Sequence, residues 1–135
     1  MWFKEYKEWL SQQAMVVVLV EHIDAVKNLK AILSVKGVDG YMVGPYDLSA
    51  SMGMPGEPDH PEVLASLKHV REVAKALGVP GGVHVIRPDP AAIHRRIDEG
   101  FTFLAYSLDI LMLGETCRQG LAAIKASRSM EGKHS

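Results

Sequence analysis

The sequence predicts an α/β fold in which parallel strands alternate with helices. Four short runs rich in β-branched residues and glycine are separated by stretches in which apolar residues recur at helical spacing. The first of these runs, Met15–Val20, is polar on neither face, which is typical of a strand covered on both sides. Strands and helices that alternate at this spacing form parallel sheets with right-handed crossovers.

The N-terminal half supplies two of the strands. In chain order we expect a helix at 2–13, a strand at 15–20, a helix at 24–35, a strand at 38–43 and a short helix at 47–52. Charged residues alternate with aromatic ones in the first helix, whereas Val26, Leu29 and Leu33 give the second its apolar face. Gly44-Pro45 ends the second strand, and a loop rich in glycine and proline follows the short helix.

The C-terminal half supplies the other two strands. We expect a helix from Pro61 to 77, a strand at 81–86, a helix from Pro90 to 99, a strand at 101–106 and a helix at 109–127. Both prolines suit first helical positions, with Asp59 or His60 capping one helix and Asp89 the other. Gly78 and Gly100 suit the positions at which these two helices end.

Composition places the chain among soluble globular proteins, with 47% hydrophobic and 23% charged residues. The net charge of −1 argues against nucleic acid or an anionic membrane as the main partner. The longest apolar run, 14–20, is too short to span a bilayer. The single Cys117 lies on an apolar helical stripe, which predicts a buried, inert thiol and a cytoplasmic location.

One structural unit is expected over residues 1–127, followed by a polar tail at 128–135, because no linker or repeat interrupts the pattern. Four strand–helix units suit either an open sheet or half of an eight-stranded barrel. The pattern alone does not choose between these two architectures.

Acidic residues follow three of the four strands, where parallel α/β folds place their working groups. Glu21 and Asp47 are candidate metal ligands, and Asp109 is more typical of a helix N-cap. Pattern alone also allows Glu21 to be a loop-edge cap, and it favours Asp47 as an N-cap serving the amide of Ser49 or Ala50. Neither a glycine-rich nucleotide fingerprint nor zinc-ligand spacing is present.

Several of these residues lie in segments that resemble a known family. The segments are Val18-Leu19-Val20-Glu21-His22, Ala25-Val26-Lys27-Asn28, Gly37-Val38-Asp39-Gly40 and the block from Gly44-Pro45-Tyr46-Asp47-Leu48-Ser49 to Gly53. Together with Gly100-Phe101 and Ser107-Leu108-Asp109, they resemble the HpcH/HpaI aldolases, and the resemblance runs over about 14–126. It implies the C-terminal half of a TIM-type (β/α)8 barrel of the phosphoenolpyruvate/pyruvate superfamily.

The resemblance also implies a site and a chemistry. Family members bind one divalent cation, Mg, Mn or Co, at positions that match Glu21 and Asp47, and they cleave or form a bond between a pyruvate-type 2-oxo acid and an aldehyde. The substrate carboxylate is expected at the backbone amides of Tyr46 and Asp47. Gly44, Pro45, Tyr46 and Asp47 are therefore the expected substrate-binding residues. His84 does not match the family's base histidine, but its position at a strand end predicts that it lines the pocket.

One departure limits the expected activity. The family's catalytic arginine and base histidine lie in the first half of the barrel, and no segment here matches that half, so the catalytic residues stay unassigned. We expect a class II aldolase that is truncated and of low activity alone. The alternatives are a non-catalytic half-barrel that binds metal and oxoacid, and a condensing, citrate-synthase-like relative. The expected macromolecular partner is a second copy of this chain or a complementary half-barrel chain.

Overall fold

The structure is a computed structural model that describes the backbone of residues 2–131 and the side chains of residues 2–126. Its elements are, in chain order, α1 (Phe3–Gln13), β1 (Val17–Val20), α2 (Ile23–Lys27), α3 (Leu29–Leu33), β2 (Gly40–Val43), α4 (Pro45–Ser51), α5 (Pro61–Leu77), β3 (Gly81–Val85), α6 (Pro90–Asp98), β4 (Phe103–Tyr106) and α7 (Asp109–Glu131). The predicted alternation of strands and helices is confirmed.

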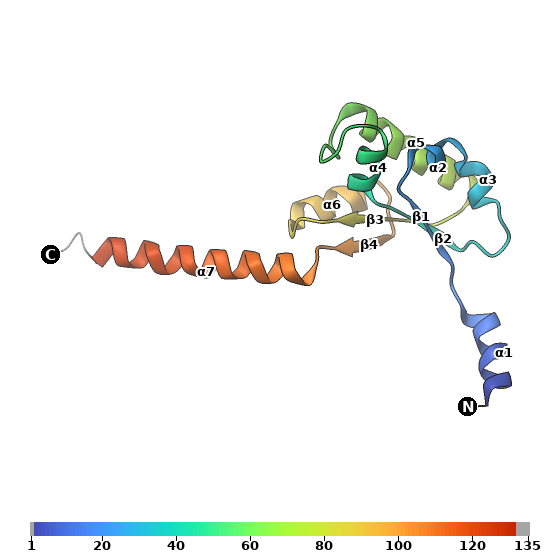
Figure 1. Cartoon of the computed structure of the whole chain (residues 1–135), viewed down its shortest axis with the longest axis horizontal. Coiled ribbons are helices and arrows are strands. Elements are labelled where there is room, and N and C mark those ends of the chain that lie inside the picture. The colour runs from blue at the N-terminus through green and yellow to red at the C-terminus, as the bar shows by residue number, and fades with distance from the viewer. Residues whose placement is uncertain (1, 132–135) are drawn as a thin grey trace.

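The four strands form one sheet in the order β1-β2-β3-β4, and every neighbouring pair is parallel. In this sheet Val20 pairs with Val43, and Val43 pairs with Val83. All three valines are fully buried beneath the helices, and Figure 1 shows α2 to α6 gathered on one side of the sheet. The hydrophobic core therefore lies between the sheet and this single helical layer.

The opposite face of the sheet is open. Side chains alternate between the two faces of a strand, so the residue that precedes Val20 points away from the helices. That residue, Leu19, is 60% exposed, and Phe103 on β4 is 51% exposed. The expectation that β1 is covered on both sides is therefore wrong for this chain, because no element among residues 2–131 covers the second face.

Local sequence sets most of the helix boundaries. The predicted helix at 24–35 is two short helices, α2 and α3, which meet at Asn28. In α5, His60 is the N-cap, Pro61 takes the first helical position and Gly78 ends the helix in the left-handed conformation, as expected. The helix α4 begins at Pro45 with Gly44 as its N-cap, so the interpretation of Asp47 as an N-cap is wrong.

Both terminal helices extend away from the sheet (Figure 1). The expected apolar stripe of α7 is present, but Leu113 is 67% and Leu121 is 60% exposed. Cys117 on the same stripe is exposed as well, which overturns the prediction of a buried thiol. The helix runs to Glu131, into the stretch 128–135 expected to be a polar tail, and residues 132–135 lie outside the described part. None of the helices described is long and apolar enough to cross a membrane.

Candidate metal and oxoacid site

The site lies on the open face, just beyond the ends of the strands. Val20 pairs with Val43 and Val43 with Val83, so one residue further along each strand the register aligns Glu21, Gly44 and His84. These three residues form a row across β1, β2 and β3. Because Gly44 has no side chain, the row contains a gap between the carboxyl group of Glu21 and the imidazole of His84.

Asp47 reaches the same gap from the first turn of α4. Its position follows from the turn at Gly44-Pro45, because Pro45 fixes the start of the helix and places Asp47 at its third residue. A Cβ built on Gly44 would lie 2.9 Å from Glu21 Oε1 and 3.0 Å from Asp47 Oδ2. Both oxygens thus surround one point, and they are at most about 6 Å apart.

This convergence fits a divalent cation. Oxygens that share one Mg²⁺ or Ca²⁺ each lie about 2.0–2.6 Å from it, so two of them stand up to about 5 Å apart. Two carboxylates are also the donor type that hard cations prefer. Among the described residues there is no group of three or more His, Cys, Asp or Glu side chains able to hold a metal. A cation here would therefore complete its coordination with water or substrate oxygens, as Mg²⁺ commonly does.

A pocket of about 190 Å³ contains the two carboxylates. Its walls come from the ends of β1, β2 and β3 and the start of α4: Leu19, Glu21, Met42, Val43, Gly44, Pro45, Tyr46, Asp47, His84 and Ile86. Every residue predicted to bind metal or substrate therefore lines one cavity. The third strand-end acid, Asp109, is not among these lining residues. His22, which follows Glu21, also lies outside this pocket. It is the N-cap of α2 and accepts a hydrogen bond from the amide of Asp24.

The ring of His84 is held by the end of β4. Its Nε2 lies 3.2 Å from the carbonyl oxygen of Ser107. The backbone N–H of Ser107 donates in turn to the carbonyl oxygen of Val85, at 2.8 Å. Ser107 has a φ of 60°, which is uncommon for a residue other than glycine, and its buried hydroxyl has no hydrogen-bond partner among the described residues.

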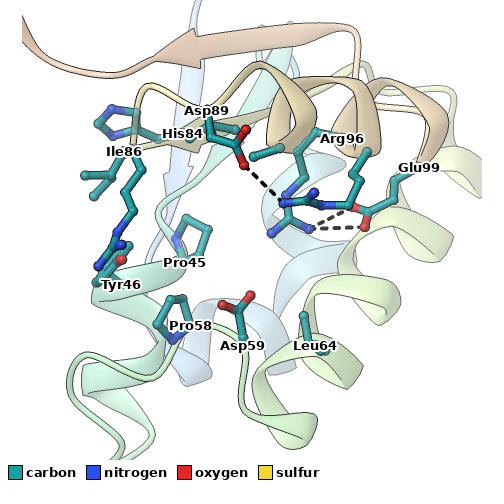
Figure 2. A pocket seen from close by; sticks show the side chains of 14 residues that line it. Pro45, Tyr46, Pro58, Asp59, Leu64, His84, Ile86, Asp89, Arg96 and Glu99 are labelled. Atoms are coloured by element: carbon teal, nitrogen blue, oxygen red, sulfur yellow. Dashed lines mark hydrogen bonds and ion pairs between the residues drawn. The ribbon is translucent and has the colours of Figure 1, made fainter. Parts of the chain in front are cut away.

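A second, larger pocket adjoins the first. It has a volume of about 330 Å³ and shares Pro45, Tyr46, His84 and Ile86 with it. Figure 2 shows its charged wall on α6, where Arg96 pairs with Glu99 at 2.9 Å and the guanidinium of Arg95 lies 3.6 Å from Asp89. His84 thus stands between a pocket with two carboxylates and one with paired charges.

The apolar residues of the pocket wall and the role of Ser107 in holding His84 were not identified from the sequence. Leu19 and Met42 lie two residues before Glu21 and Gly44, so the period of two along a strand places each pair on one face. That signal was available in the sequence. The positive φ of Ser107 could not be predicted, because the residue types in the segment 107–109 are typical of an ordinary strand-to-helix turn.

Comparison with known proteins identifies the family of this chain. The sequence profile of the family described as HpcH/HpaI aldolase/citrate lyase matches residues 5–114. The chain belongs to this family. The resemblance to the HpcH/HpaI aldolases that was predicted from the motif around Gly44 and Asp47 is therefore confirmed.

Curated relatives in the HpcH/HpaI family carry aldolase names. The hydroxypyruvate/pyruvate aldolase of Cupriavidus necator is 34% identical over 125 residues, which are 93% of this chain and 46% of that protein. The 4-hydroxy-2-oxo-heptane-1,7-dioate aldolase of Shigella sonnei is 38% identical over 123 residues, 88% of this chain and 44% of that protein. The chain thus spans about half the length of the curated relatives that it matches.

Solved structures give the same picture of the fold. An HpcH/HpaI aldolase/citrate lyase family protein from Burkholderia cenocepacia superposes with a TM-score of 0.85 at 31% identity, covering 90% of this chain and 47% of that one. The citrate synthase SbnG superposes with a TM-score of 0.81 at 22% identity, a likeness of fold alone. The chain has the fold of about half of a family member, as expected for half of a barrel.

Proposed function

We propose that this chain forms the metal- and oxoacid-binding half of an HpcH/HpaI-type aldolase, a carbon–carbon lyase that acts on a pyruvate-type 2-oxo acid and an aldehyde. The observation that carries the proposal is the convergence of Glu21 Oε1 and Asp47 Oδ2 on the open space beside Gly44. Aldolase names among relatives up to 39% identical support it. A condensing reaction, suggested by the SbnG likeness, is the alternative, but that likeness is one of fold alone.

In this proposal Glu21 and Asp47 hold a divalent cation, Mg, Mn or Co. Cleavage of an aldol leaves an enolate, and a bound divalent cation supplies the Lewis-acid stabilisation of its negative oxygen. The amides of Tyr46 and Asp47 precede the first hydrogen bond within α4, which runs from Leu48 N to Gly44 O. We assign these two amides to the substrate carboxylate. Leu19, Met42 and Ile86 form the apolar part of the pocket wall.

Metal binding tests the proposal directly. Glu21→Gln and Asp47→Asn keep the side-chain shapes but remove one charge each, so each is expected to weaken Mn²⁺ binding roughly tenfold or more. Titration followed by calorimetry or by the Mn²⁺ electron paramagnetic resonance signal measures this loss. The matched control is Glu57→Gln, on an exposed loop residue that should leave the affinity unchanged. Undiminished binding in both site variants would remove these carboxylates as ligands.

Catalysis by the isolated chain is expected to be weak. The proton-transfer residues implied by the family resemblance have no counterpart here, so a retro-aldol assay with added Mn²⁺ should release pyruvate far more slowly than a full-length family member does. Turnover as fast as that of a full-length member would show that the described half needs no complement. If Glu21→Gln or Asp47→Asn lost metal binding without any loss of turnover, the cation would have no part in the reaction, and the metal-dependent lyase mechanism would be wrong.

A further inference from the structure

His84 occupies a defined place in the row across the sheet. It lies one strand from Gly44, and neighbouring strands are about 4.8 Å apart. Its side chain lines both the pocket that holds Glu21 and Asp47 and the larger pocket beside it. A ligand that fills the space beside Gly44 and extends along the row therefore meets the imidazole next.

The contact with Ser107 determines which ring nitrogen of His84 carries the proton. A carbonyl oxygen only accepts hydrogen bonds, so the nitrogen 3.2 Å from it, Nε2, must donate. In a neutral imidazole the other nitrogen, Nδ1, is then an acceptor. No described residue forms a hydrogen bond with Nδ1. The ring thus offers one acceptor that the fold itself leaves unused.

Ser107 is itself held in place by the fold, so the orientation of the His84 ring is fixed by the backbone around it. Its amide donates a hydrogen bond to the carbonyl oxygen of Val85 on β3, the strand that carries His84, and its φ of 60° lies in the left-handed region. The residue is only 8% exposed, and its buried hydroxyl lacks a partner. Strained and unsatisfied residues of this kind cluster at functional sites.

An aldol-type 2-oxo acid matches this arrangement. Its hydroxyl oxygen on C4 lies three bonds from the keto carbon, roughly 4 Å away at bond lengths of about 1.5 Å. That reach is close to one strand spacing. With the keto acid beside Glu21 and Asp47, we infer that His84 Nδ1 accepts a hydrogen bond from the C4 hydroxyl. His84 is then a specificity-determining residue for hydroxylated 2-oxo acids, an inference that rests on the proposed function.

A pair of ligands and a pair of variants test this role. The ligands are 4-hydroxy-2-oxobutanoate and 2-oxobutanoate, which differ by one hydroxyl, each titrated calorimetrically into the whole chain with Mg²⁺. His84→Gln keeps a donor near the position of Nε2 but loses the acceptor at Nδ1, whereas His84→Asn keeps an acceptor near Nδ1. His69→Gln is the control, because it makes the same change at an exposed histidine of α5 that lines neither pocket.

The wild-type chain is expected to bind the hydroxylated acid about three- to tenfold more tightly than 2-oxobutanoate. His84→Gln should lose this preference and bind 2-oxobutanoate as before, while His84→Asn retains part of it and His69→Gln keeps all of it. Nitrogen-15 spectra of the imidazole should show the tautomer with the proton on Nε2, whether or not ligand is present.

Three results would overturn the inference. The first is equal binding of the two acids by the wild-type chain, and the second is an unchanged preference in His84→Gln. The third is a proton on Nδ1 in the neutral ring. In each of these cases normal binding of 2-oxobutanoate would leave the proposed function standing. If neither acid binds, the proposed function fails and the inference fails with it.

Discussion

At the scale of single residues, the site depends on one position without a side chain. Glu21 and His84 flank Gly44 in the row across the sheet, and Asp47 reaches over it from α4. The sequence predicted these partners because they follow strands, but it did not predict that Gly44 provides the space between them. It also misassigned Asp47 as a cap, because an acidic residue near a helix start is compatible with either role.

Replacing Gly44 tests this account. The backbone of Gly44 has φ −100° and ψ 94°, which alanine adopts without strain, so Gly44→Ala should change the free energy of unfolding by less than about 1 kcal/mol. The new Cβ would lie about 3 Å from both carboxylate oxygens and fill the space between them. We expect Mn²⁺ affinity to fall about tenfold or more, measured by calorimetry alongside urea unfolding.

Gly120→Ala is the control for this substitution. Its Cβ would meet no atom within 4 Å, and Gly120 lies in α7, far from the site along the chain. This variant should bind Mn²⁺ as the wild-type chain does. If Gly44→Ala also bound Mn²⁺ normally, the cation would not occupy the space beside Gly44.

At the scale of elements, local residues predicted most boundaries but not which faces are buried. Caps such as His60 and Gly78 act within one turn, so they can be read from neighbouring residues in the sequence. Burial depends on what lies opposite, so the exposure of Leu19 and Cys117 could not be read from an apolar pattern. For the same reason, the sequence did not predict that Gly81 on β3 leaves space for the ring of Tyr41 on the neighbouring strand β2.

The burial of Tyr41 makes the free energy of unfolding depend on pH in the alkaline range. Tyr41 is buried on β2, and burial raises the pKa of its phenol above 10.0, although the charge of Arg71 partly opposes the shift. The neutral phenol is thus favoured in the fold, and its stabilisation is complete below pH 10. It is lost as pH rises from the pKa of the unfolded chain through the higher pKa of the fold.

Tyr41→Phe removes this titration. Between about pH 9 and pH 11, the unfolding free energy of the wild-type chain should fall more steeply than that of Tyr41→Phe, as urea denaturation at each pH would show. Tyr6→Phe, on the exposed face of α1, should follow the wild-type curve. Parallel curves for Tyr41→Phe and the wild-type chain would mean that the phenol ionises equally easily in both states.

At the scale of the whole molecule, the sequence predicted sequential parallel strands, and the family resemblance added that they are half of a barrel. Neither the sequence nor the resemblance predicted how much apolar surface this half-barrel exposes. The outer edges of β1 and β4 have no partner strand within the described sheet, and the open face carries Leu19 and Phe103. Exposed strand edges and apolar patches of this kind favour association.

We therefore propose that the chain self-associates, with the stripe of α7 through Leu113 and Leu121 as one of the buried surfaces. Light scattering after size-exclusion chromatography should give a mass above the 14.8 kDa of one chain. Leu121→Lys should raise the concentration needed for assembly about tenfold, because it places a charge on the stripe. Gln119→Lys adds the same charge to the polar side of α7 and should leave assembly unchanged. A monodisperse monomer would contradict the proposal, since the apolar stripe would then remain in water.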